Sequence, residues 1–151
     1  MSHKITIYTD GASSGNPGPG GYGVVLMSGS HRKELSEGFK RTTNNRMELL
    51  AVIVALEALK ADNCIVTIYT DSKYVADAVS KGWVFSWEKK NFKGKKNPDL
   101  WKRFLATYRK HQIRFVWVKG HANIPENERC DQLAVEASKQ PFLKDDVGYE
   151  A

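Results

Sequence analysis

The pentapeptide Thr6-Ile7-Tyr8-Thr9-Asp10 recurs letter for letter as Thr67-Ile68-Tyr69-Thr70-Asp71. Both copies belong to apolar, β-branched runs over 4–9 and 65–70, which is typical of strands. A helical crossover separates the two runs, so the second strand can lie parallel to the first. If the strands are neighbours, the aspartates that end them lie about 5 Å apart, the spacing of adjacent strands. Open α/β sheets bind ligands at this edge, so the pair is a candidate site.

The other elements are expected on either side of this repeat. Two further strands, over 22–27 and 33–39, enclose a turn at 28–30 and form an antiparallel meander with the first strand. Helices are predicted over 47–61, 72–80, 99–111 and 127–139, and a last strand over 113–119. The run Gly-Asn-Pro-Gly-Pro-Gly-Gly at 15–21 is predicted to be a shaped loop and lacks the Gly-Lys-Ser/Thr of a P-loop. Strand and helix alternation after a meander predicts an α/β fold with a mixed sheet.

Length and composition indicate one globular domain. The chain has 151 residues, of which 41% are hydrophobic and 26% charged, enough to bury one sizeable core. No apolar run approaches the roughly 18 residues that cross a bilayer. The first residues lack the regions of a signal peptide, so we expect a cytoplasmic protein without membrane contact. Cys64 and Cys130 belong to no metal-type pair and are expected to be reduced thiols.

The net charge of +6 is concentrated in one segment. Residues 81–103 carry eight basic and two acidic side chains, whereas the rest of the chain holds fifteen of each. Aromatic residues are interleaved with these lysines, among them Trp83, Trp87, Phe92 and Trp101. A solvated face packed on core rings would explain the pattern. The functional alternative is a surface that binds a polyanion, with exposed rings stacking on bases.

Four acidic residues are candidates for chemistry, and each also has a structural explanation. Asp10 could belong to an Asp-Gly turn, Asp71 could cap a helix, and Glu48 completes a capping box with Asn45. Asp131 could be a solvated helix residue. However, like charges at two strand ends are costly without a cation. Carboxylates without His or Cys partners suit Mg²⁺ or Mn²⁺ rather than zinc, although spacing alone does not join Glu48 and Asp131 to the aspartates.

Six motifs occur along the chain in a definite order. They are Tyr-Thr-Asp-Gly at 8–11, Gly-Asn-Pro-Gly-Pro-Gly-Gly-Tyr-Gly at 15–23, Arg-Thr-Thr-Asn-Asn-Arg-Met-Glu-Leu at 41–49, Thr-Asp-Ser at 70–72, Trp-Val-Lys-Gly-His at 117–121 and Glu-Asn-Glu-Arg-Cys-Asp at 126–131. Together they closely resemble bacterial type I ribonuclease H. The resemblance implies a single domain over 1–139, with a five-stranded mixed sheet, helices on both faces and a basic protrusion at about 82–97. The tail over 140–151 lacks periodicity and is expected to be loosely held.

The resemblance also implies an activity. Such an enzyme hydrolyses the RNA strand of RNA/DNA hybrids internally, uses two Mg²⁺ ions or Mn²⁺ in their place, and leaves 5′-phosphate and 3′-hydroxyl ends. The implied metal ligands are Asp10, Glu48, Asp71 and Asp131. His121 matches the family's mobile histidine, which assists proton transfer or product departure. The implied role is removal of RNA primers and hybrids by a monomer.

Substrate contacts are carried over in the same way. The residues expected to read the minor groove, where RNA presents 2′-hydroxyls, are Asn16, Asn44 and Asn45. Those expected to cup a DNA phosphate are Arg41, Thr43 and Asn97. Those in the aromatic positions of the protrusion are Trp83 and Phe92, the latter where the family often has tryptophan. Lys73 stands where glutamine is frequent and is counted among the substrate contacts.

Two alternatives remain open at this point. A non-catalytic hybrid-binding protein could use the basic segment and keep the acidic residues only as caps. A pure binder, however, gains nothing from negative charges that face phosphate. Another enzyme of the same fold, such as an integrase, resolvase or exonuclease domain, would not require the 41–49 motif or the basic segment.

Overall fold

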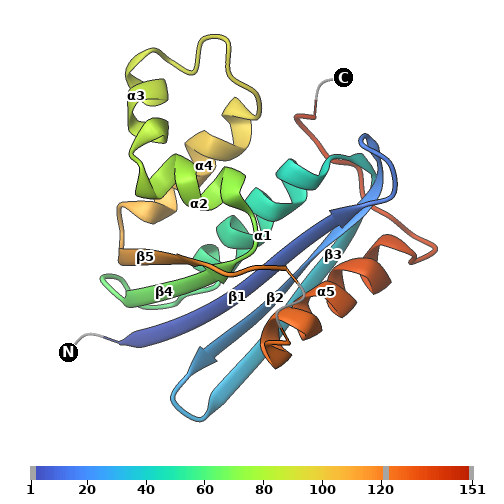
Figure 1. Cartoon of the computed structure of the whole chain (residues 1–151), viewed down its shortest axis with the longest axis horizontal. Coiled ribbons are helices and arrows are strands. Elements are labelled where there is room, and N and C mark those ends of the chain that lie inside the picture. The colour runs from blue at the N-terminus through green and yellow to red at the C-terminus, as the bar shows by residue number, and fades with distance from the viewer. Residues whose placement is uncertain (1–2, 121–122, 150–151) are drawn as a thin grey trace.

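The structure is a computed structural model that describes residues 3–120 and 123–149. Its strands are β1 (Lys4–Ser13), β2 (Gly18–Ser28), β3 (His31–Thr42), β4 (Ile65–Thr70) and β5 (Gln112–Trp117). Its helices are α1 (Asn44–Glu57), α2 (Lys73–Ser80), α3 (Trp83–Lys89), α4 (Pro98–Tyr108) and α5 (Pro125–Ser138). The strands form one mixed sheet in the order β3-β2-β1-β4-β5, as predicted from the meander and the repeat (Figure 1).

The repeated pentapeptides lie side by side at the centre of this sheet. β1 and β4 pair in parallel with Thr6 opposite Thr67 and Tyr8 opposite Tyr69. The rings of Tyr8 and Tyr69 stack with their centroids 4.8 Å apart. β1 also pairs antiparallel with β2, and β4 pairs in parallel with β5. The register therefore places Asp10, which lies within β1, level with Asp71, which directly follows β4.

Helices cover both faces of the sheet. α5 alone packs on one face, mainly against β2, while α1 packs on the other face against β1 and β2 (Figure 1). α4 packs on the outer side of α1, and α2 packs near β5. This arrangement explains why α1 is apolar on nearly every side, since it is enclosed between the sheet and α4. None of the described helices is both long and apolar enough to span a membrane.

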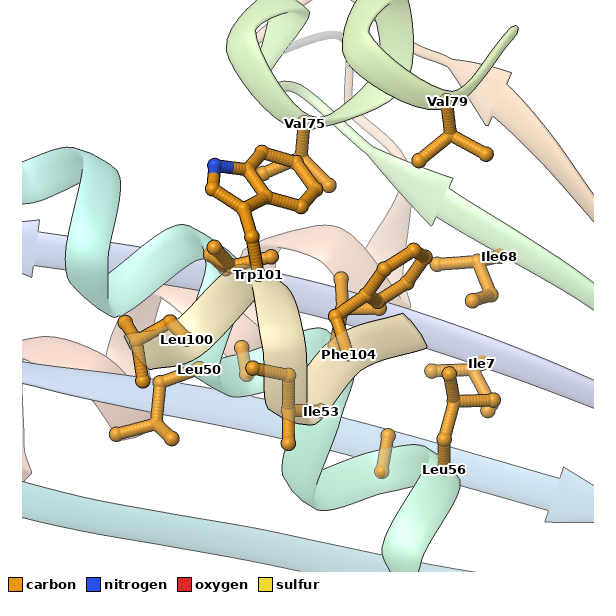
Figure 2. Packing of buried hydrophobic residues seen from close by; sticks show 14 of the residues in the cluster. Ile7, Leu50, Ile53, Leu56, Ile68, Val75, Val79, Leu100, Trp101 and Phe104 are labelled. Atoms are coloured by element: carbon orange, nitrogen blue, oxygen red, sulfur yellow. The ribbon is translucent and has the colours of Figure 1, made fainter. Parts of the chain in front are cut away.

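The main core lies between the sheet and the helices α1, α2 and α4. Figure 2 shows Trp101 and Phe104 of α4 among aliphatic side chains of α1 and α2, with Ile68 of β4 beside the Phe104 ring and Ile7 of β1 below it. Both aromatic rings are fully buried and meet edge to face, with centroids 5.6 Å apart. Such large buried rings dominate core energetics and fix the position of α4. Both cysteines are free and buried.

The glycine-rich segment differs from its prediction as a loop, because β2 already begins at Gly18. A Cβ on Gly23 would lie 2.2 Å from the Cys130 carbonyl oxygen, and one on Gly21 would lie 2.5 Å from the Ala134 carbonyl oxygen. β2 can therefore meet the backbone of α5 only without side chains. Tertiary packing here overrides the low strand propensity of glycine.

The described part of the C-terminal tail makes specific contacts that its prediction as a loosely held segment did not include. Lys144 forms an isolated parallel bridge with Phe39 of β3. Asp146 accepts hydrogen bonds from Arg46 Nε at 2.7 Å and from the Thr42 hydroxyl at 2.7 Å. The Asp146 side chain is only 5% exposed. Single residues make these contacts with partners about a hundred positions away, so no local pattern could announce them.

Candidate active site

The site begins with the two aspartates that follow the repeated strands. Asp10 lies in β1 and Asp71 directly follows β4, each two residues beyond the paired tyrosines Tyr8 and Tyr69. Residues two apart on a strand point to the same face, so both carboxylates emerge on one side of the sheet. One carboxylate oxygen from each of Asp10, Asp71 and Glu48 lies within 4.8 Å of the other two. The predicted meeting of the strand-end aspartates is confirmed.

Glu48 reaches this pair because β1 and α1 approach very closely. A Cβ on Gly11 would lie 2.4 Å from the Glu48 backbone nitrogen, so only glycine permits the approach. Thr43 caps α1, and its hydroxyl accepts a hydrogen bond from the Arg46 backbone N–H at 3.2 Å. The capping box expected for Asn45 and Glu48 is therefore wrong. Glu48 lies in the second helical turn and points into the site instead of back to a cap.

The crowded carboxyl groups have altered acidity. Burial, followed by the charges of Asp71 and Asp131, raises the pKa of Asp10 to about 8. Burial, followed by Asp10 and Asp71, also raises the pKa of Glu48 well above its usual range. Within the described residues, Glu48 Oε1 and Asp71 Oδ1 are buried without a hydrogen-bond partner. Unpaired buried oxygens among like charges fit a hard divalent cation. Such an ion would coordinate the oxygens and offset the repulsion between the carboxylates.

Asp131 lies on α5, which packs on the face of the sheet opposite to α1 and Glu48. It lines a cavity of about 190 Å³ together with Asp10 and Asp71. The close contact between α5 and the glycines of β2 sets its position. Asn127, one turn earlier on α5, lines the same cavity, and its Oδ1 atom is buried and unpaired within the described residues. Asn127 is a site residue that the sequence analysis did not select, although its i, i+4 spacing to Asp131 could have indicated it.

The loop after β5 forms another part of the cavity wall. Val118, Lys119 and Gly120 line the cavity beside Asp71. A Cβ on Gly120 would lie 3.3 Å from Asp71 Oδ2. His121, the predicted mobile histidine, directly follows but lies outside the described residues, so its role stays a prediction.

The predicted minor-groove residues gather where β1, β2 and α1 meet. The Asn44 backbone N–H donates to Asn16 Oδ1 at 3.2 Å, and the Ser13 hydroxyl donates to Asn44 Oδ1 at 3.0 Å. Asn45 is exposed in the first turn of α1. Asn16 and Asn44 thus hold one another, and their amide N–H groups take no part in these hydrogen bonds.

The predicted phosphate-binding residues surround the buried guanidinium of Arg46. Asn97 Oδ1 accepts from Arg46 Nη1 at 3.3 Å, and Asn97 Nδ2 donates to the Tyr74 hydroxyl at 3.1 Å. Thr43 caps the turn that carries Arg46, and Arg41 is exposed at the end of β3. The three residues therefore border one corner between α1, β3 and α4.

The basic protrusion consists of α3 and the loop that follows it, which extends away from the sheet (Figure 1). Its lysines are exposed, and Trp83 is 46% exposed with Lys81 Nζ 5.2 Å from its ring centroid. Phe92, by contrast, is 4% exposed and belongs to the main core. The predicted substrate contact of Phe92 is therefore corrected: its ring anchors the loop and is not presented to a ligand.

Lys73 lies beside the carboxylates. Its Nζ atom is 4.8 Å from the ring centroid of Trp117, and Trp117 Nε1 donates to the Asp71 backbone oxygen at 3.0 Å. Trp117, 45% exposed, was not selected as a candidate. A cation held on an exposed ring next to Asp71 is a suitable contact for a polyanion near the clustered carboxylates.

Comparison with known proteins identifies relatives of this chain. The profile of the RNase H family matches residues 2–139. A ribonuclease H of Desulforamulus reducens is 60% identical over 149 residues, which cover 95% of this chain and 93% of the relative. A ribonuclease H of Citrobacter koseri is 53% identical over 156 residues, which cover 100% of this chain and 99% of the relative.

Solved structures agree with these sequence relatives. LC9-RNase H1, described as a type 1 RNase H with the type 2 active-site motif, is 32% identical with a TM-score of 0.83, and covers 91% of this chain and 73% of that one. LC11-RNase H1, solved in complex with an RNA/DNA hybrid, is 29% identical with a TM-score of 0.67, and covers 88% and 95%. Both the sequence and the fold lead to one assignment: the chain is a bacterial member of the ribonuclease H family.

Proposed function

We propose that the chain cuts the RNA strand of RNA/DNA hybrids at internal positions with two divalent metal ions, and leaves 5′-phosphate and 3′-hydroxyl ends. The observation that carries this proposal is the convergence of Asp10, Glu48 and Asp71, with oxygens within 4.8 Å of one another. Asp131 lines the same cavity. Membership of a metal-dependent family supports the proposal.

The four carboxylates would hold Mg²⁺, with Mn²⁺ as a substitute. Bound ions of this kind activate water and stabilise the oxygen that leaves a phosphodiester. Asp10 and Glu48 would lose their protons as the ions bind, because burial and the neighbouring carboxylates raise the pKa of both groups. Glu48 and Asp71 contribute the unpaired buried oxygens. His121 is proposed to assist proton transfer or departure of the product.

The substrate contacts are proposed from the residues that flank the carboxylates. Asn16, Asn44 and Asn45 lie where they can read the minor groove, in which only the RNA strand carries 2′-hydroxyls. Arg41, Thr43 and Asn97 take a DNA phosphate, and the basic protrusion with Trp83 follows the DNA strand. Lys73 contacts the RNA strand near Asp71. Contacts to both strands explain why a hybrid, and no other duplex, places its RNA strand at the carboxylates.

We further propose that the protein acts as a cytoplasmic monomer that removes RNA primers and other hybrids. The basic segment supports a nucleic-acid partner, and its exposed lysines predict affinity that depends steeply on salt. Its replication or repair partners are not assigned.

The test is cleavage of an end-labelled RNA/DNA hybrid, compared with RNA/RNA and DNA/DNA duplexes of the same sequence. We expect internal cuts in the hybrid RNA alone with Mg²⁺, and none with excess chelator. Labelling each end in turn identifies the phosphate and hydroxyl termini. Binding without cuts under any divalent ion would instead favour the non-catalytic hybrid-binding protein. Equal cutting of DNA/DNA would favour another nuclease of this fold.

A further inference from the structure

We infer that the C-terminal residues 146–149 position the groups that bind the DNA phosphate, so that the tail is part of the substrate-binding apparatus. This inference rests on the proposed function, which places Arg41, Thr43 and Asn97 around that phosphate. The tail contacts this corner at two separate points. One contact acts through Arg46 on Asn97, and the other acts directly on Arg41.

The first contact is a chain of buried polar groups. Asp146 accepts from Arg46 Nε at 2.7 Å and from Arg46 Nη2 at 3.0 Å, while Arg46 Nη1 donates to Asn97 Oδ1 at 3.3 Å. The Arg46 side chain is 1% exposed, so its guanidinium has little freedom to reorient. A planar guanidinium held on one edge by a carboxylate presents its remaining N–H groups in a fixed direction. Asp99 holds the other edge of the same guanidinium, accepting from Arg46 Nη1 at 2.9 Å and from Nη2 at 2.8 Å, so Asp146 and Asp99 together fix the Arg46 group that contacts the amide of Asn97.

Asn97 needs such support because its backbone is unusual for a residue with a side chain. It has a φ of 62° directly before Pro98, the first residue of α4. The Asn97 amide is held from one side by Arg46 and from the other by the Tyr74 hydroxyl, which also accepts from Trp101 Nε1 at 2.8 Å. One amide hydrogen of Asn97 remains for a ligand after these bonds are made.

The second contact is aromatic. The Tyr149 ring lies 5.7 Å from the guanidinium carbon of Arg41 and 5.8 Å from that of Arg46. Arg41 is exposed, so without the ring its long side chain would sample many rotamers. Gly148 brings the ring into place, since a Cβ there would lie 2.4 Å from Asp99 Oδ2. Tyr149 therefore pre-orders the exposed cation of the corner.

These contacts hold the phosphate-binding residues in place and do not block the position that a phosphate would take. Asp146 is paired with a fully buried arginine and with the Thr42 hydroxyl, so its carboxylate does not occupy the exposed position that a phosphate would take. Asp146 pairs with Arg46, and among residues 3–120 and 123–149 no acidic side chain forms a salt bridge with Arg41. Asp146 and Tyr149 are therefore positioning residues, and the sign of the effect on affinity separates support from competition.

The test compares Tyr149→Ala with Tyr149→Phe and with Phe142→Ala, in the full-length protein. Phe142 lies in the same tail, is 93% exposed and serves as the matched control. For Tyr149→Ala we expect KM for the hybrid to rise about two- to fivefold, the effect of one exposed cation–π contact, with kcat little changed. Tyr149→Phe keeps the ring and should restore KM, and Phe142→Ala should leave KM and kcat unchanged. Asp146→Asn, which removes the charge behind Asn97, should also raise KM.

A substrate series makes the test specific for the DNA phosphate. Single neutral methylphosphonate linkages are moved along the DNA strand, and the KM penalty of each is measured. The wild type should show a large penalty at the linkage held by Arg41 and Asn97. In Tyr149→Ala that penalty should shrink while the penalties elsewhere persist, because the contact is already weakened.

Three results would overturn the inference. KM could stay unchanged, it could fall, which would mark the tail as a competitor, or all penalties could persist while only the thermal midpoint drops. If the wild type cuts no hybrid, the proposed function fails instead. The dissociation constants of the same hybrids, measured by fluorescence anisotropy, then still decide whether the tail supports binding.

Discussion

Asp10 shows how a carboxyl group at a strand end differs from the same group in a turn. Its carboxylate accepts a hydrogen bond from the Gly11 backbone N–H at 2.9 Å, as an Asp-Gly turn would allow. This hydrogen bond favours the charged form of Asp10. Burial and the charges of Asp71 and Asp131 outweigh this bond and raise the pKa of Asp10 to about 8. The Asp-Gly turn proposed for Asp10 therefore accounts for its hydrogen bond to Gly11 but not for its raised pKa.

Replacing this carboxylate should separate catalysis from binding. We expect Asp10→Asn to lower kcat by on the order of a thousandfold or more, because one metal ligand is lost from a site whose members act together. Binding of the hybrid should persist and become slightly tighter, since a negative charge that faces phosphate is removed. Single-turnover cleavage and anisotropy measure the two effects. Asp62→Asn, at an exposed position, is the control of equal charge, and equal cleavage by wild type and Asp10→Asn would refute the assignment.

The same substitution should change how stability depends on pH. A carboxyl pKa of about 8 in the folded chain, against about 4 when unfolded, means that the folded state binds more protons between these values. The free energy of unfolding therefore decreases as pH rises from about 4 to about 8 without metal ions. Asp10→Asn lacks this group, so in chelator it should be more stable than the wild type at pH 8, by on the order of 2 kcal/mol. The gain should vanish towards pH 4.

Urea unfolding at a series of pH values, with chelator and then with Mg²⁺, checks this expectation. Mg²⁺ should stabilise the wild type more than Asp10→Asn, since only the wild type retains the full ligand set. Parallel pH profiles for the two proteins would show that Asp10 titrates normally, and the crowding argument would then be wrong.

The individual site residues were predictable to different degrees. The strand-end aspartates followed from the repeat, because register and side-chain alternation are regular. Glu48 and Asp131 required the family resemblance, since a close helix–strand approach at Gly11 leaves no local pattern. Asn127 was missed because its relevance lies in a buried, unpaired Oδ1 atom. Trp117 was missed because its Nε1 atom contacts the backbone oxygen of Asp71. Phe92 was misjudged because an aromatic residue among lysines looks the same in sequence whether it is exposed or buried.

At the scale of elements, the basic protrusion is an exposed unit on a buried base. Phe92 and Trp101 anchor it to the core, and Lys95 Nζ lies 5.2 Å from the ring centroid of Trp87. Its backbone bends through left-handed conformations at Asn91, Phe92 and Gly94. The anchored base holds the lysines in place, whereas an unanchored charged loop would present them only on average.

Neutralising the loop lysines should weaken substrate binding more than turnover. We expect the combined Lys93→Ala, Lys95→Ala and Lys96→Ala protein to show a higher KM with a smaller change in kcat, because the carboxylates are untouched. Each lost phosphate contact should also reduce the slope of log affinity against log salt by about 0.7 to 0.9. Steady-state kinetics at several salt concentrations measure both quantities.

The control removes an equal charge elsewhere. Lys4, Lys33 and Lys139 are exposed on other elements, and replacing these three with alanine should leave the salt slope nearly unchanged. If the loop variant also keeps the wild-type slope, the protrusion does not contact the substrate.

Element positions were largely predictable, whereas their boundaries were less so. β4 matched its expected range, since an apolar run with clear ends defines it. α1 begins at Asn44 and not at Met47, because its cap is the hydroxyl of Thr43, four residues before the apolar run. α3 has no long periodic pattern of its own and was expected only from the family resemblance. β2 extends through glycines that no strand propensity would favour, because α5 lies directly on them.

At the scale of the whole molecule, charges of opposite sign are kept apart in one domain. The acidic cluster involves Asp10 in β1 and Asp71 after β4, while the exposed lysines belong to α3 and its loop, which Figure 1 shows away from the sheet. A hybrid that lies on both must present one strand to each. The separation permits strong phosphate binding by the lysines without neutralising the clustered carboxylates.

The tail beyond residue 139 contacts the rest of the domain, because Arg46 is buried between two carboxylates, Asp99 at 2.8 Å and Asp146 at 2.7 Å. Deleting residues 140–151 would leave this arginine with one carboxylate, and losing a partner of a buried ion pair is costly. We expect the deletion to lower the free energy of unfolding by about 2 kcal/mol, measured by urea unfolding. In an Arg46→Met background the same deletion should cost less, since no buried charge is left unpaired. An equal cost in both backgrounds would trace the loss to the apolar contacts of the tail, and no cost in either would make residue 139 the true end of the domain.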